Sequence, residues 1–206
     1  GEFGLAIQAF GKAIELDPKN AVAYKDRGIA HGMQEEYDLE IEEYSKAIEL
    51  DPAYKLAYFD RGVAYGRKGE YDKAIEDYGH VIKLRPDDIS SRRERATLFE
   101  QLGAYERAIA DFSKVIELNS DDLTTYCHRA TAFVKTGDYD RAIEDATMAI
   151  RLDPENSWPY AIRANAHSRS KQPDQAIADC REAIRIDPNE VWPHQILAKH
   201  YRQVGE

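Results

Sequence analysis

The side chains best suited to catalysis or metal binding in this 206-residue chain are its six histidines and two cysteines. An enzyme or a metal site needs several such groups at defined spacings, so that they reach one atom together. The sequence contains no His-Glu-x-x-His motif, no glycine-rich phosphate loop and no nucleophile elbow. The histidines are scattered as His31, His80, His128, His167, His194 and His200. This distribution predicts a non-enzymatic protein without a metal or a cofactor.

The two cysteines do not form a reactive or metal-binding motif either. Neither Cys127 nor Cys180 has a cysteine or histidine at a zinc-ligand spacing, and no histidine is placed to activate Cys127. Unpaired cysteines favour a reduced, intracellular and cytoplasmic protein. No apolar run reaches the roughly 18 residues of a membrane span, and no secretory signal is visible.

Charge excludes some partners. The formal net charge is −10, and the pI is near 5.2. An acidic chain is a poor binder of nucleic acids or membrane surfaces unless its basic residues gather on one face. We therefore expect no nucleic-acid and no membrane partner.

A second chemistry, ion pairing, recurs along the chain at a fixed spacing. Arginine occurs every 34 residues, at Arg27, Arg61, Arg95, Arg129 and Arg163. An acid follows each arginine at Glu43, Asp77, Asp111, Asp145 and Asp179. A guanidinium between helices needs a carboxylate, since an unpaired buried charge is costly. We predict that each arginine pairs with the acid of its own repeat. The alternatives are pairing with the neighbouring repeat's acid, or a row of arginines lining a ligand groove.

The elements that position these pairs are two helices per repeat. In the repeat that begins at Lys55, two stretches with apolar residues at helical spacing are separated by Gly69 and closed by Pro86. Glycine takes the left-handed cap conformation at little cost, and proline cannot continue a helical hydrogen-bond ladder. Small residues recur at the eighth repeat position, as Gly28, Gly62, Ala96, Ala130 and Ala164. They allow two helix axes to approach closely.

The period, the small residues, the aromatic residues and the closing prolines resemble the tetratricopeptide repeat family from Leu5 onward. The Tyr-x-x-Arg-Gly phrases are similar to the style common in bacterial members. The resemblance implies an all-α, right-handed solenoid of stacked antiparallel helix pairs, as one domain. Its expected segments are a cloning scar (1–3), the second helix of a truncated repeat (4–20), five repeats (21–54, 55–88, 89–122, 123–156 and 157–190) and a terminal capping helix (191–206).

Several residues depart from the family pattern. Glu40 replaces a small residue, Glu35 and Lys171 replace the capping glycine, Pro173 replaces a tyrosine, and Ser120 replaces the closing proline. We expect altered turns near residues 35 and 172 without a break in the stack.

In this family the first helix of each repeat lines a concave groove, and the resemblance implies which residues face it here. The expected apolar residues are Val22, Ile29, Met33, Leu56, Phe59 and Val63. The expected basic residues are Lys25, Arg67, Arg93, Lys135, Arg169, Lys199 and Arg202, with Glu100 as the one acid. The remaining expected members are Thr97, Thr131, Asn165, Trp158, Trp192 and Cys127.

A basic groove on an acidic protein favours an acidic peptide segment or a chain-terminal carboxylate, with the tryptophans as anchors. The sequence thus predicts a protein–protein interaction scaffold. Alternatively, the acids at the sixth repeat position (Asp26, Asp60 and Glu94) balance the basic row, or the apolar residues pack against other parts of the protein. A self-assembly module that forms a homo-oligomer through its end helices is a further alternative.

One narrower ligand is excluded: the acidic C-terminus of heat-shock chaperones. Ile29, Asp60 and Glu94 stand where the family's carboxylate clamp needs two asparagines and an arginine.

Overall fold

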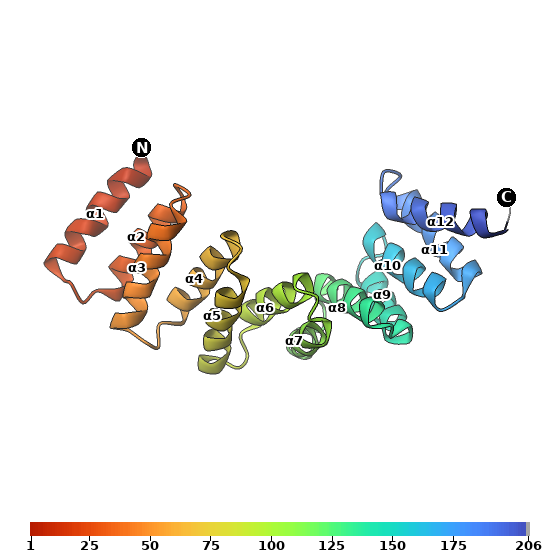
Figure 1. Ribbon diagram of the computed structural model, residues 1–206, viewed down its shortest axis with the longest axis horizontal. Coiled ribbons are helices and arrows are strands. Elements are labelled where there is room, and N and C mark those ends of the chain that lie inside the picture. The colour runs from red at the N-terminus through yellow and green to blue at the C-terminus, as the bar shows by residue number, and fades with distance from the viewer. Residues whose placement is uncertain (205–206) are drawn as a thin grey trace. The chain divides into compact units, whose positions relative to one another are not determined.

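The computed structural model describes residues 1–204, and of residues 203 and 204 only the backbone. This part of the chain forms helices and contains no strand (Figure 1). The helices are α1 (Glu2–Leu16), α2 (Ala21–Gly32), α3 (Tyr37–Leu50), α4 (Lys55–Arg67), α5 (Tyr71–Leu84), α6 (Ile89–Gln101), α7 (Tyr105–Leu118), α8 (Leu123–Thr136), α9 (Tyr139–Leu152), α10 (Ser157–Arg169), α11 (Pro173–Ile186) and α12 (Val191–Val204). They group into two compact units, Gly1–Arg95 and Ala96–Glu206.

Consecutive helices pack as antiparallel hairpins within each unit. In the first unit α2 packs on α3 and α4 on α5, and in the second α8 packs on α9 and α10 on α11. The second helix of a hairpin also contacts the first helix of the next one, as α3 contacts α4 and α9 contacts α10. This arrangement confirms the prediction of an all-α solenoid of stacked helix pairs. Helix α1 begins at Glu2, so two residues of the expected cloning scar are helical, and residues 205 and 206 lie outside the described chain.

The small residues act as predicted, by leaving room for a neighbouring ring. A Cβ atom built on Gly28 would lie 2.8 Å from the ring of Tyr44, and one on Gly62 would lie 2.9 Å from the ring of Tyr78. Real side chains do not approach so closely, so any larger residue at these two positions would separate the helices of the hairpin.

The turns inside the hairpins keep one backbone conformation. Gly69, Gly103 and Gly137 have φ angles of 76°, 73° and 86°. Glu35 and Lys171 adopt the same left-handed region, with φ of 62° and 61°. The expected alteration near residues 35 and 172 is thus wrong for the backbone conformation, which tertiary packing imposes on residues that disfavour it.

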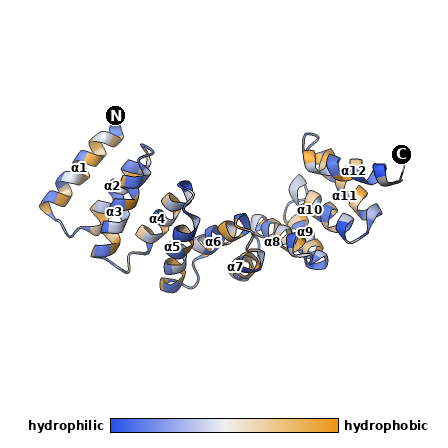
Figure 2. Ribbon diagram, in the orientation of Figure 1, coloured by the Kyte–Doolittle hydropathy of each residue, from blue (hydrophilic) through white to orange (hydrophobic). Residues whose placement is uncertain are grey.

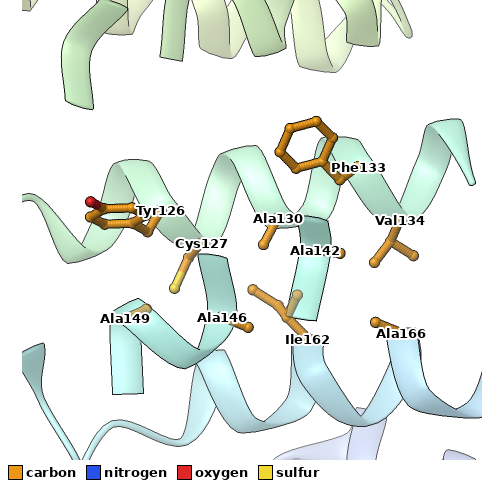
Figure 3. Packing of buried hydrophobic residues seen from close by; sticks show 10 residues of the cluster. All are labelled: Tyr126, Cys127, Ala130, Phe133, Val134, Ala142, Ala146, Ala149, Ile162 and Ala166. Carbon is orange, nitrogen blue, oxygen red and sulfur yellow. The ribbon is translucent and has the colours of Figure 1, made fainter. Parts of the chain in front are cut away.

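The core of the second unit is built largely from alanine (Figure 3). Its buried members are Tyr126, Cys127, Ala130, Phe133, Val134, Ala142, Ala146, Ala149, Ile162 and Ala166. They come from α8, α9 and α10, and hydrophilic residues occupy other positions of the same helices (Figure 2). Alanine at the buried positions of α9 brings its axis close to both neighbours, and the larger rings of α8 fill the space that remains.

Each recurring arginine that can be followed within one unit pairs with the acid of its own repeat. The shortest N···O distance is 2.7 Å in all four pairs, Arg27–Glu43, Arg61–Asp77, Arg129–Asp145 and Arg163–Asp179. In the three pairs that involve aspartate, Nε and Nη2 both donate to the carboxylate. Such two-point contact matches the planar fork of the guanidinium. The prediction of pairing within the repeat is confirmed for these four arginines.

Three of these four arginines reach a third helix, which the sequence reasoning missed. Arg61 and Arg129 donate from Nη1 to the hydroxyls of Ser45 and Ser113, each at 3.0 Å. Arg163 donates in the same way to Thr147 at 3.1 Å. Each hydroxyl lies on the second helix of the preceding repeat, so one guanidinium joins two hairpins. A sequence pattern could have predicted this contact, because a small residue stands 16 positions before each arginine: Gly11, Ser45, Gly79, Ser113 and Thr147.

Replacing Arg129 by methionine should destabilise the protein by about 3 kcal/mol, because Asp145 would keep a charge at 5% exposure without its partner. Urea unfolding of the two proteins measures the difference. Arg185→Met is the control, since Arg185 forms exposed ion pairs with Glu182 and Glu155 and its loss should leave the unfolding midpoint nearly unchanged. Equal effects of the two substitutions would contradict the central role of the buried pair.

Candidate peptide-binding surface

The first unit presents exposed apolar side chains at the predicted groove positions of α2 and α4. Val22, Ile29, Met33 and Leu56 are 53%, 40%, 60% and 49% exposed. Phe59 is half-buried, and its ring lies 5.6 Å from that of Tyr78 on α5. Val63, one helical turn further along α4, is also half-buried.

The basic residues of the first unit are balanced by acids. The ammonium group of Lys25 lies 3.2 Å from Asp26 and 3.9 Å from Asp60, and its side chain is only 14% exposed. Burial raises the pKa of the Asp60 carboxyl above its ordinary value. Asp26 and Asp60 are the acids at the sixth repeat position, and they neutralise Lys25, as one of the alternatives predicted. Lys25 therefore adds little free positive charge.

Arg67 faces a buried acid of the same unit. Its Nη1 lies 3.9 Å from Oε1 of Glu40, which also accepts a hydrogen bond of 3.0 Å from the Tyr44 hydroxyl. Glu40 is 4% exposed, and among the described residues its Oε2 has no hydrogen-bond partner. Burial raises the pKa of Glu40, and the bond from Tyr44 and the charge of Arg67 lower it by less. Gly32 provides the space, since a side chain there would meet the Glu40 carboxylate.

The second unit differs, because its predicted basic residues line hollows of their own. A cavity of about 320 Å³ is lined by Thr131, Val134, Lys135, Asn165, Arg169 and Trp192. A neighbouring cavity of about 260 Å³ is lined by Asn165, Ser168, Arg169, Trp192, Gln195, Ile196 and Lys199. Because Asn165, Arg169 and Trp192 border both, we treat the two cavities as one surface and call it the cationic pocket. It is formed by α8, α10 and α12.

Among the residues that the structure describes, no carboxylate balances the cations of this pocket. Arg169 donates from Nε to the Asn165 Oδ1 at 3.1 Å. Within the part of the chain that the structure describes, no carboxylate lies at ion-pair distance from Lys135, Arg169 or Lys199. Lys135, Arg169 and Lys199 are exposed, whereas the ring of Trp192 is half-buried against the core. The pocket therefore combines three free cations, an amide and an indole.

Glu100, the one acid expected in the groove, is already engaged. Its Oε2 lies 2.8 Å from Nδ1 of His128. The His128 ring stacks on Phe112 at 5.6 Å and meets the edge of Trp158 at 5.2 Å. Trp158 is thus held in a structural cluster, beside rather than within the cationic pocket.

The remaining predicted residues lie elsewhere. Arg93 and Thr97 are half-buried on α6, and Arg202 is exposed near the end of α12. The expectation that Cys127 faces the groove is wrong, because its side chain is fully buried in the alanine-rich core. Burial raises the pKa of its thiol to about 12, which removes the reactive thiolate at neutral pH. Cys180 is likewise buried, as expected.

Comparison with protein families matches four tetratricopeptide repeat models, at residues 1–20, 34–69, 64–126 and 128–191. Together these matches span most of the chain. The chain belongs to the tetratricopeptide repeat family. Comparison with curated protein sequences gives no significant match.

Solved structures share the fold. The chain is 21% identical to YrrB, described as a tetratricopeptide repeat protein with an unusual peptide-binding site, with a TM-score of 0.83 over 92% of this chain and 97% of that one. It is 20% identical to a MamA protein, with a TM-score of 0.78 over 83% and 93% of the two chains. It is 16% identical to MamA of Desulfovibrio magneticus RS-1, with a TM-score of 0.76 over 82% of this chain and 96% of that one.

The described residues also bear on other kinds of site. No helix there has the length and apolar character needed to cross a membrane. No group of three or more His, Cys, Asp or Glu side chains is arranged to hold a metal ion.

The buried carboxylate of Glu40 should make stability depend on pH. A folded-state pKa above the unfolded value of about 4.5 means that the folded protein binds the proton more tightly, so stability rises as the pH falls through the folded-state pKa. Glu40→Gln, which carries no charge, should be more stable than the parent by about 1 kcal/mol at pH 7.5. This gain should shrink at pH 5. Urea unfolding at both pH values measures this gain. The control is the exposed Glu42→Gln, which should show no such change. An equal gain of Glu40→Gln at both pH values would contradict the raised pKa of Glu40.

Proposed function

We propose that this chain is a protein–protein interaction scaffold whose cationic pocket binds an acidic segment of a partner polypeptide. The observation that carries the proposal is the set of three cations, Lys135, Arg169 and Lys199, that have no carboxylate partner among the described residues, on a chain of net charge −10. Unbalanced cations around a hollow attract a ligand of opposite charge and orient it on approach.

The other side chains of the pocket suit a peptide. Because the Asn165 carbonyl oxygen accepts a bond from Arg169, the amide orientation leaves its NH₂ group free to donate to a carboxylate or a main-chain carbonyl. Trp192 offers a rigid apolar surface beside these polar groups, as in many binding hot spots. A segment with carboxylates spaced along an extended main chain satisfies all of these groups at once.

The structural similarities agree with this proposal without specifying the ligand. YrrB is described as having a peptide-binding site, and it shares this fold. On that basis a polypeptide is a better candidate than a small molecule for a surface formed by three successive first helices. We also propose that the protein has no enzymatic activity of its own.

Self-assembly is the second candidate. Leu5 and Leu16 of α1 are 68% and 78% exposed, and such side chains favour contact with another protein surface. Multi-angle light scattering over a hundredfold range of protein concentration separates the two functions. A constant monomer mass would exclude self-assembly as the main role, and a mass that rises with concentration would support it.

The charge-reversal variant Lys135→Glu/Arg169→Glu should bind an acidic peptide about tenfold more weakly or worse, since two attractive charges become repulsive. The probe is a fluorescein-labelled decapeptide of Asp and Glu, titrated with the protein and followed by fluorescence polarisation. Added salt should weaken binding by the parent protein. The matched control is Lys83→Glu/Arg181→Glu, which changes the net charge equally at exposed positions outside the pocket. Equal loss in both variants would reduce the effect to net charge, and absence of saturable binding by the parent would reject the proposal.

A further inference from the structure

A third hollow of the second unit lies between α10, α11 and α12. Its volume is about 410 Å³, within the range of ligand pockets. The residues that line it are Ser168, Lys171, Pro173, Ala176, Ile177, Ile196, Leu197, Lys199 and His200. It shares Ser168, Ile196 and Lys199 with the cationic pocket, so the two adjoin along α12.

The same place in the preceding repeat is filled. The residues 34 positions earlier include Val134, Ala142, Ile162 and Ala166, all buried in the alanine-rich core (Figure 3). Tyr139 packs against that core from the start of α9. The buried members of that core come from α8, α9 and α10, and the hollow is bordered by the three corresponding helices.

Substitutions at the equivalent positions account for the opening. Pro173 stands where four earlier repeats have Tyr37, Tyr71, Tyr105 and Tyr139. The proline suits the first position of α11 but provides no ring to pack against α12. Ser168 replaces Val134, which removes more apolar volume. The side chain of one aromatic residue is therefore missing from this repeat.

We infer that this hollow, which we call the Pro173 pocket, accepts an aromatic side chain of the acidic peptide proposed above. The inference rests on the proposed function. Pro173, Ala176, Ile177, Ile196 and Leu197 give the pocket an apolar lining, on which water finds few partners and an aromatic ring is favoured.

Charge selects the sequence around that ring. Lys171 and Lys199 are exposed where they line the Pro173 pocket, and within the described chain neither has a carboxylate at ion-pair distance. Lys199 also lines the cationic pocket, so a ring in one hollow and a carboxylate in the other belong to neighbouring ligand residues. The ligand class is thus an acidic segment with one aromatic residue.

The peptide test compares two fluorescein-labelled decapeptides of Asp and Glu that differ at one central residue, Phe or Ala. The parent protein should bind the Phe peptide about tenfold more tightly, as expected for burial of one aromatic ring. Pro173→Tyr fills the pocket with the residue that the other repeats use, so the ratio should fall to about one while affinity for the Ala peptide is unchanged. Pro173→Ala, which fills nothing, should keep the preference.

A second arm tests the pocket without a peptide. 3-Phenylpropionate, an aromatic carboxylate, is titrated into protein with labelled Ile and Leu methyl groups. The methyl signals of Ile177, Ile196 and Leu197 should shift in the parent and in Pro173→Ala, but not in Pro173→Tyr. Thermal melting should show Pro173→Tyr to be at least as stable as the parent, and a lower melting temperature would contradict the equivalence with Tyr139.

The outcomes separate the two proposals. Binding of both peptides without preference for Phe, or a preference that persists in Pro173→Tyr, overturns the aromatic inference and leaves the acidic-ligand function standing. Entry of 3-phenylpropionate without binding of either peptide overturns the proposed function and, with it, the peptide ligand assigned to the Pro173 pocket.

Discussion

The structure depends on a guanidinium that is held between three helices. Arg61, Arg129 and Arg163 each bond an aspartate of the same hairpin and a hydroxyl of the preceding one. Alanine and glycine bring the helices close, but small apolar residues pack in many registers with similar energy. A two-point ion pair that also reaches a third helix is satisfied in only one register. In the second unit, repetition of this contact by Arg129 and Arg163 gives successive first helices a common orientation, and therefore a common surface.

The fold could be predicted because every element of it is repeated. The arginines and their acids recur every 34 residues, which gave the period, and the cost of an unpaired buried charge indicated that each arginine pairs with an acid. The third partner of the arginine was equally periodic and could have been found. The left-handed turns at Glu35 and Lys171 could not, because their residue types oppose the conformation and only packing across the hairpin imposes it.

The candidate site was harder to predict because its charge and exposure depend on contacts between residues of different repeats. A count of basic residues at groove positions treats Lys25 and Lys135 alike. Lys25 is neutralised by Asp26 and Asp60, whereas Lys135 has no carboxylate at ion-pair distance within the described chain. The burial of Cys127 has a similar cause. Helix α10 packs on α8, and Cys127 lies in the core that these two helices share with α9. Sequence position alone does not report such distances.

A repeat protein can gain a binding site by losing one side chain. Each repeat packs against its neighbours with equivalent residues. When one repeat loses a large side chain, the cavity that results has the shape of the side chain that the other repeats keep at that position. At Pro173 the missing shape is a tyrosine ring, and the hollow adjoins cations that have no acid partner among the residues the structure describes. The hollow is bordered by α10, α11 and α12, and the arginine contacts of Arg129 with Ser113 and of Arg163 with Thr147 do not involve its lining residues. The stack can therefore tolerate the hollow, and a ligand that fills it would restore the packing that the other repeats have from their own chain.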